Sequence, residues 1–228
     1  LGHTIIPLKP SLVPIESPDK FCRDMQGLSL KNTGMTVVNA DSGKEVYSDF
    51  GEMLFTHFGI SGPMVLSAGA NIKNPDKTKY VIYLDLKPAL SEEKLDQRIL
   101  RDFEKNINKA VSNSLGELLP RKMIPVVLNR WGISFDTKCN SVTREQRTAL
   151  VKLLKSFSIN VKGFRPIEEA IVTSGGVCTK EINPSTMESR IVKGLYFAGE
   201  VIDVDGYTGG FNLQIAFSTG WAAGESCL

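Results

Sequence analysis

Residues 194–224, with the sequence GLYFAGEVIDVDGYTGGFNLQIAFSTGWAAG, are the most informative stretch of the chain. The run at 195–198 is short and apolar, which predicts a strand buried on both faces. Gly199 then permits a tight turn, and Glu200 places a carboxylate just past the carboxyl end of that strand. Ligands of open α/β sheets bind at this end, so the pattern predicts a binding site there.

A glycine-rich loop follows and leads into a helix that is expected to begin near Phe211 or Asn212. The loop contains Asp203, Asp205, Gly206, Gly209 and Gly210. A helix N-terminus exposes free N–H groups and carries about half a positive charge. It therefore favours an anion, such as a phosphate or the negatively charged edge of a reduced flavin. A glycine-rich turn without any ligand fits the same residues, so the pattern alone leaves a cofactor open.

The segments before this stretch alternate between strand and helix character. Residues 1–20 contain four prolines and are expected to form an extended connector. Residues 21–88 and 159–175 contain strand-like runs, with a hairpin predicted at 41–44. Residues 89–158 contain an apolar stripe that recurs every four residues, an N-cap at Ser91 and a capping box at 143–146, and they predict a three-helix insertion.

Composition excludes several classes of protein. The net charge is +2 without a polybasic run, which argues against a nucleic-acid partner. The apolar stretches are too short to span a membrane. Four widely spaced cysteines and two histidines predict no metal site, and reduced thiols of this kind are typical of a cytoplasmic protein. We therefore expect a cytoplasmic protein with a small-molecule substrate, no nucleic acid and no membrane.

The 194–224 pattern resembles the C-terminal FAD fingerprint of a bacterial flavoprotein family. Its members are NAD(P)/FAD-dependent oxidoreductases, and they include aminoacetone oxidase and bile-acid reductase relatives. Two further segments match the family: GEMLFTHFGISGP at 51–63, and IVTSGGV at 171–177 with EINP at 181–184 and MES at 187–189. The resemblance covers essentially the whole chain.

The resemblance implies a mixed α+β architecture. A β-barrel-like domain with a three-helix insertion would accompany the C-terminal part of a Rossmann-type FAD domain. The implied parts are a connector from the FAD domain (1–20), the β-barrel-like substrate domain (21–88 and 159–175), the helical insertion (89–158) and the FAD-domain part (176–228). No GxGxxG motif is found, so its half of the FAD domain is expected upstream of Leu1. We expect the chain by itself to bind FAD weakly or not at all.

The resemblance also implies positions for the FAD contacts. Gly199 and Glu200 would lie at the ribityl and pyrophosphate region, with Asp203 close by. The isoalloxazine ring would be approached on one side by Gly209, Gly210, Phe211, Asn212 and Leu213. Its other side would be lined by Ser174, Gly175 and Gly176.

The implied function is a flavin-dependent oxidoreductase that moves a hydride between an organic substrate and FAD, with NAD(P)H as a possible co-substrate. The start of the helix at Asn212 would stabilise charge on the reduced ring. Thr56 and His57 are weaker candidates for a substrate site, and the sequence identifies no catalytic side chain. The alternative is a non-catalytic module that binds a substrate or partner.

Overall fold

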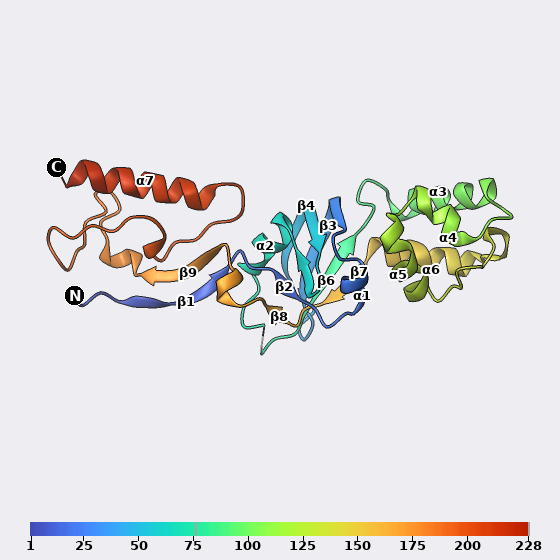
Figure 1. Cartoon of the computed structure of the whole chain (residues 1–228), viewed down its shortest axis with the longest axis horizontal. Helices are drawn as coiled ribbons and strands as arrows, with labels where there is room; N and C mark the ends of the chain where they lie inside the picture. The colour runs from blue at the N-terminus through green and yellow to red at the C-terminus, as the bar shows by residue number, and fades with distance from the viewer. Residues whose placement is uncertain (76, 228) are drawn as a thin grey trace.

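Three lobes lie in a row in the computed structural model, which describes residues 1–75 and 77–227 (Figure 1). A curled β-sheet forms the middle lobe, and a block of helices forms the lobe at one end. The other end holds both termini and contains β1 (Ile5–Ser11), β9 (Val172–Val177) and α7 (Phe211–Ser226). We call these the sheet, helical and C-terminal lobes. The observed α+β character agrees with the sequence expectation.

The sheet lobe is one antiparallel sheet of seven strands in the order β7-β6-β3-β4-β5-β2-β8. Their bounds are β2 Ile15–Glu16, β3 Ser29–Asn39, β4 Glu45–Phe55, β5 Gly59–Ser61, β6 Tyr80–Asp85, β7 Phe157–Asn160 and β8 Gly163–Phe164. Only Val161 and Lys162 separate the two edge strands, so the sheet curls until its two edges lie near each other. In the described part of the chain no ladder joins β7 to β8. The expected barrel is therefore an open, curled sheet.

Alternation of buried and exposed side chains sets the inner face of this sheet. Met35 and Val37 of β3 and Ile82 and Leu84 of β6 are at most 1 % exposed, while residues between them face outward, as strand geometry requires. The hairpin predicted at 41–44 joins β3 to β4 and is confirmed. Two short helices complete the lobe, α1 (Phe21–Asp24) and α2 (Pro63–Gly69), and α2 packs against β4.

The helical lobe is inserted between β6 and β7, as predicted, but it contains four α-helices instead of three. They are α3 (Glu92–Lys105), α4 (Val111–Ser114), α5 (Ile124–Trp131) and α6 (Arg144–Lys155), with 3₁₀ turns at Leu115–Glu117, Arg121–Met123 and Cys139–Ser141. The long apolar stripe is interrupted at Asn106, whose side-chain amide donates to the Asp102 carbonyl at 2.9 Å. This bond caps the end of α3 and leaves Ile107 51 % exposed.

The capping box at the start of α6 gives the first testable prediction. The Thr143 hydroxyl accepts from the Gln146 amide at 3.2 Å, and the Gln146 side chain accepts from the Thr143 amide at 2.9 Å. We expect Thr143→Ala to lower the free energy of unfolding by about 1 kcal/mol, because the Gln146 amide loses its side-chain acceptor. Urea denaturation measures this. Thr148→Ala, farther along the same helix, is the matched control and should change stability by less than half as much.

The C-terminal lobe has few buried side chains. Its apolar cluster contains Val177, Ile182, Met187 and Ile202, and α7 has no buried residue. The helix begins at Phe211 as predicted. The strand predicted at 195–198 is not formed, and this stretch makes a single bridge from Tyr196 to Glu188. A strand of that kind needs parallel neighbours, and the described residues supply none.

The proline-rich segment is a strand and not only a connector. β1 pairs antiparallel with β9, and its register is irregular between Ile6 and Lys9, where Pro7 lacks an amide proton. Proline is tolerated because each strand of a two-stranded sheet has a free edge. The domain limits set from the sequence stay a prediction. Among the described residues, no helix is both long and apolar enough to cross a membrane.

Candidate functional site

The start of α7 is open in the way that the glycine-rich loop predicts. Gly209 and Gly210 have φ values of 110° and 91°, which only glycine adopts without strain. Gly210 caps the helix and no side chain accepts from its first amides. A Cβ added at Gly210 would meet nothing within 4 Å. The first amides of this sixteen-residue helix therefore have no side-chain acceptor among the described residues, and the space beside Gly210 is open, an arrangement that fits an anionic or electron-rich ligand.

Asn212 braces this loop with its side chain. Its amide oxygen accepts from Gly206 N at 2.8 Å, and its amide nitrogen donates to Gly206 O at 3.0 Å. The neighbouring Phe211 and Leu213 are 59 % and 62 % exposed. Asn212 thus fixes the approach of the chain to the helix start.

The two glycines of β9 are required for a different reason. Gly175 and Gly176 are buried with φ values of 94° and 130°. A Cβ on Gly175 would collide with the backbone of Pro7, and one on Gly176 would collide with the backbone of Val201. Close approach of protein backbone therefore explains both glycines, and the structure places no open space beside them.

Ser174 lines a cavity of about 790 Å³ between the sheet and C-terminal lobes. Lys9 and Asp205 line the same cavity. The Asp205 carboxylate accepts from the Ser11 hydroxyl at 2.5 Å. Asp205 therefore ties the glycine-rich loop to β1, and polar groups border the cavity on both sides.

The turn after residue 198 joins α7 to β9. Gly199 N donates to the Thr219 hydroxyl of α7 at 2.9 Å, and Asp203 N donates to the Val177 carbonyl of β9 at 2.9 Å. Glu200 lies in the 3₁₀ turn Gly199–Val201 and is exposed. The structure thus brings the sequence-predicted residues of 174–176, 199–203 and 209–213 into one lobe.

A polar network that sequence reasoning missed connects the glycine-rich loop to the sheet lobe. The Thr208 hydroxyl lies 3.1 Å from the Ser67 hydroxyl of α2. The Asn71 amide donates to the Tyr207 hydroxyl at 3.3 Å, and the Tyr207 ring lies 6.5 Å from the Tyr47 ring. Tyr207 and Thr208 stand directly before Gly209, which was the one available signal. Their partners lie more than 130 positions away in sequence.

Tyr47 carries the most perturbed hydroxyl of this network. Burial, and then its hydrogen bond to Asp49, raise its pKa well above the usual value. The hydroxyl donates to Asp49 Oδ2 at 2.7 Å. Tyr47 therefore stays protonated at any physiological pH and acts as a hydrogen-bond donor.

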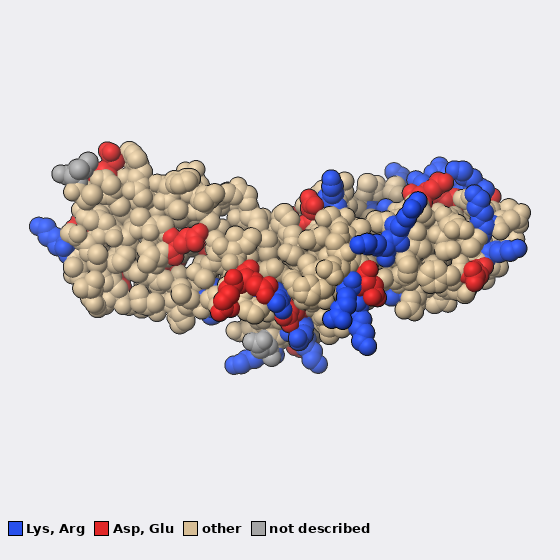
Figure 2. Space-filling model, viewed as in Figure 1, with Lys and Arg blue, Asp and Glu red and all other residues tan. Residues whose placement is uncertain are grey.

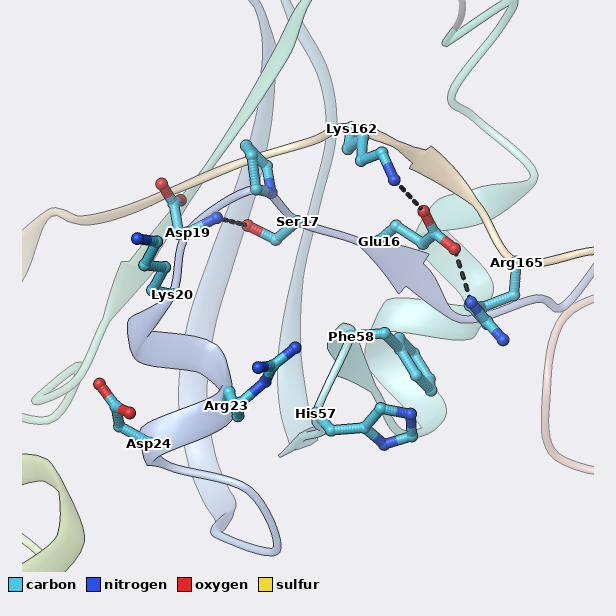
Figure 3. Close-up of a pocket in the computed structure, with 11 residues that line it drawn as sticks. Glu16, Ser17, Asp19, Lys20, Arg23, Asp24, His57, Phe58, Lys162 and Arg165 are labelled. Atoms are coloured by element: carbon cyan, nitrogen blue, oxygen red, sulfur yellow. Dashed lines mark hydrogen bonds and ion pairs between the residues drawn. The ribbon is translucent and has the colours of Figure 1, made fainter.

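Thr56 and His57 do not join this site. Thr56 accepts from Gly59 N at 3.1 Å and holds the turn before β5. His57 is exposed and lines a separate cavity of about 630 Å³ in the sheet lobe (Figure 3). That cavity is bordered by Glu16, Ser17, Pro18, Asp19, Lys20, Arg23, Asp24, Phe58, Lys162 and Arg165 besides His57. No residue of the glycine-rich loop borders it.

The wall of this charged cavity contains a fixed ion cluster. Glu16 accepts from Lys162 at 2.9 Å and from Arg165 at 2.6 Å (Figure 3). The Lys162 hydrogen bond, and next the Arg165 hydrogen bond, hold the pKa of Glu16 below its usual value. Arg165 also binds Glu169. These groups largely neutralise one another, whereas Lys20 and Arg23 make no side-chain hydrogen bond or ion pair to the described residues.

Comparison with known proteins identifies a family and several similar proteins. The family model described as "HI0933-like protein barrel and H2TH domain" matches residues 9–172. The chain is 35 % identical over 227 residues to a ribosomal RNA dihydrouridine synthase of Haemophilus influenzae. The alignment covers 99 % of this chain and 53 % of that protein. It is 30 % identical to a protein of the same name from Escherichia coli (100 % of this chain, 54 % of that protein).

A third relative has a different named substrate. The chain is 29 % identical to a 3-dehydro-bile acid delta(4,6)-reductase of Clostridium scindens, over 99 % of this chain and 55 % of that protein. The chain thus spans about half the length of the curated relatives it matches. The names of these relatives describe a synthase of dihydrouridine and a reductase.

Proposed function

The chain belongs to the family of HI0933-like proteins with a barrel and H2TH domain, and from this premise we propose that it is part of a flavin-dependent oxidoreductase. The observation that carries the proposal is the start of α7. Two glycines in the left-handed region precede amides without a side-chain cap there, and the space beside Gly210 is open. That cradle fits the electron-rich edge of a flavin, and a side chain at Gly210 would fill it.

The residues that would hold FAD come from the C-terminal lobe. The amides after Gly210 would face the ring, and Glu200 offers an exposed carboxylate to sugar hydroxyls. When bound, FAD supplies hydride chemistry, which no side chain provides. The chain's own contribution is to aim the α7 amides and to keep the loop rigid through Asn212 and Thr208. NAD(P)H remains the proposed electron donor.

The reaction class follows from what the relatives' names share. Dihydrouridine is uridine reduced at a carbon–carbon double bond conjugated to a carbonyl, and a 3-oxo bile acid with 4,6 unsaturation contains the same arrangement. We therefore assign the reduction of a carbon–carbon double bond conjugated to a carbonyl. The carbon β to the carbonyl gains a hydride and the α carbon gains a proton. Tyr207, in the glycine-rich loop and held by Asn71, is the proposed source of that proton.

The second prediction concerns the full-length protein. We expect it to purify with flavin absorbance, to be reduced anaerobically by NADH or NADPH, and to be reoxidised by uridine-containing RNA or by a conjugated oxo-steroid. Tyr207→Phe should retain the flavin and slow substrate reduction by roughly 10²-fold, as loss of a general acid does. Tyr83→Phe, on an outward position of β6, is the control and should react at the wild-type rate.

A colourless full-length protein would favour the alternative, a non-catalytic binding module. The exposed apolar side chains of α7 indicate that another part of the protein covers this helix. Phe217 and Trp221 are 69 % and 70 % exposed, and large exposed apolar patches of this kind mark interfaces. We infer that this protein has a segment that corresponds to the unmatched part of the relatives. That segment would pack on α7 and complete the FAD domain. FAD titration of this chain alone should then give weak or no binding.

A further inference from the structure

We propose that Asn71 is a positioning residue of the proposed reductase. Its side-chain amide donates to the Tyr207 hydroxyl, so that the proton of Tyr207 stays available to the substrate. The inference rests on the proposed function, which names Tyr207 as the proton source, and it deepens that function by identifying the residue that directs this proton. It is carried by the donors and acceptors where α2 meets the glycine-rich loop.

The orientation of the Asn71 side chain is fixed by α2. Its Nδ2 atom lies 3.4 Å from the Ser67 carbonyl oxygen and 3.3 Å from the Tyr207 hydroxyl. A carbonyl can only accept, so the amide nitrogen and not the amide oxygen faces both groups. The backbone amide of Asn71 donates to the Ala68 carbonyl at 2.9 Å, which holds the residue at the end of α2. Asn71 therefore donates to Tyr207 from a fixed position.

The proton of Tyr207 has no acceptor among the described residues. The hydroxyl oxygen accepts from Asn71, and a phenol has only one hydrogen of its own to donate. The side chain is 48 % exposed, so that hydrogen is accessible to a ligand. Hydrogen bonds of a catalytic site are often long before the substrate binds and shorten in the complex. The arrangement thus leaves Tyr207 ready to give up a proton.

The neighbouring Tyr47 is arranged in the opposite way. Its hydroxyl donates to Asp49 Oδ2 at 2.7 Å, and its ring centre lies 6.5 Å from that of Tyr207. Burial, and then the hydrogen bond to Asp49, hold the pKa of Tyr47 well above its usual value. Tyr47 therefore stays neutral and adds no negative charge beside Tyr207. Of these two adjacent tyrosines, only Tyr207 has a proton that no protein group takes.

The proton transfer explains why a donor to Tyr207 is needed. The Tyr207 O–H bond breaks, and its electron pair stays on the phenol oxygen. The proton bonds to the α carbon of the substrate, which holds the electron pair of the former double bond. The Asn71 N–H then donates to a phenolate, and hydrogen bonds to an ionised group are about twice as strong as neutral ones. Water returns the proton, because the Tyr207 side chain is half exposed.

Cations do not supply this stabilisation. Figure 2 shows Lys and Arg gathered over the helical lobe and its junction with the sheet lobe, and few over the C-terminal lobe. In the described part of the chain, no Lys or Arg side chain bonds to Tyr207, whose hydroxyl is bonded by Asn71. The Asn71 amide is therefore the group that stabilises the phenolate.

The test follows flavin reoxidation in the full-length protein, which is reduced with NADH and then mixed anaerobically with a conjugated oxo-steroid. Asn71→Asp and Asn71→Leu keep the approximate shape of the side chain and remove its donor. Each should slow reoxidation by about ten-fold, because the phenolate loses its hydrogen bond, and should raise the solvent deuterium isotope effect on that step. Flavin content and the rate of reduction by NADH should not change, since neither depends on Tyr207. Asn71→Gln keeps the donor and should recover most of the rate.

A double variant separates action through Tyr207 from a general loosening of the loop. If Asn71 acts through Tyr207, N71L/Y207F should react no more slowly than Tyr207→Phe alone, because effects that share one partner do not add. Ser67→Ala is the matched control, since it removes a contact with Thr208 in the same loop. It should slow reoxidation by the same factor with and without Tyr207→Phe.

Three results would overturn the proposal. They are a wild-type rate in Asn71→Asp, the full effect of Asn71→Leu in the Tyr207→Phe background, and equal slowing of flavin reduction by NADH. Any of these in a yellow enzyme that Tyr207→Phe slows refutes this inference alone. A colourless protein, or a Tyr207→Phe variant that reacts at the wild-type rate, refutes the proposed function, and this inference with it.

Discussion

Gly210→Ala in the full-length protein is expected to lower FAD affinity by at least ten-fold. The added methyl group would stand in the open space before the α7 amides, where a Cβ meets no protein atom within 4 Å. The φ value of 91° also imposes a cost of about 1–2 kcal/mol on any residue with a Cβ. Flavin content after dialysis and FAD titration of the apoprotein measure the loss.

The effect of backbone strain on stability must be separated from the effect of the added methyl group on FAD affinity. Gly43 in the β3–β4 hairpin provides the matched control, since its φ value is 67° and a Cβ there also meets nothing within 4 Å. Gly43→Ala should lower the stability of the apoprotein about as much as Gly210→Ala does, with FAD affinity unchanged. Equal FAD affinity in the two variants would show that the helix start does not face the cofactor.

Local patterns predicted the elements that local interactions determine. The start of α7 follows from Gly209 and Gly210, because left-handed backbone before a helix is a property of those residues themselves. The cap at Ser91 and the capping box at Thr143 are also local, and both are present. The placement of the helical block between two strands was predicted because apolar residues recur every four residues in 89–158, whereas the segments on either side contain strand-like runs.

Features that depend on distant partners could not be predicted. The apolar run at 195–198 fits a buried strand, but a strand forms only where a neighbour is available. The stripe of the first long helix continues past Asn106, but the side chain of that residue bonds backward and ends α3. The same limit applies to the site. Ser67 and Thr208 meet only after folding, and so do Glu16 and Arg165 at the charged cavity.

Phe157→Ala is expected to lower the free energy of unfolding by about 3–5 kcal/mol, the usual cost of emptying the site of a buried phenylalanine. Phe157 is 0 % exposed at the start of β7, where the chain leaves the helical lobe and enters the sheet. Its ring packs edge-on against Phe21 of α1, with ring centres 5.4 Å apart. The guanidinium of Arg130 on α5 lies over the Phe157 ring, 4.2 Å from the ring centre. One side chain therefore joins three elements.

Urea denaturation of the full-length apoprotein measures this cost, and Phe50→Ala is its control. Phe50 on β4 is 58 % exposed, so its removal should change stability by about 0.5 kcal/mol or less. If Phe157→Ala costs as little as Phe50→Ala, the ring does not hold the helical lobe to the sheet. The sheet and helical lobes would then be held together by the other buried residues of the apolar cluster that they share.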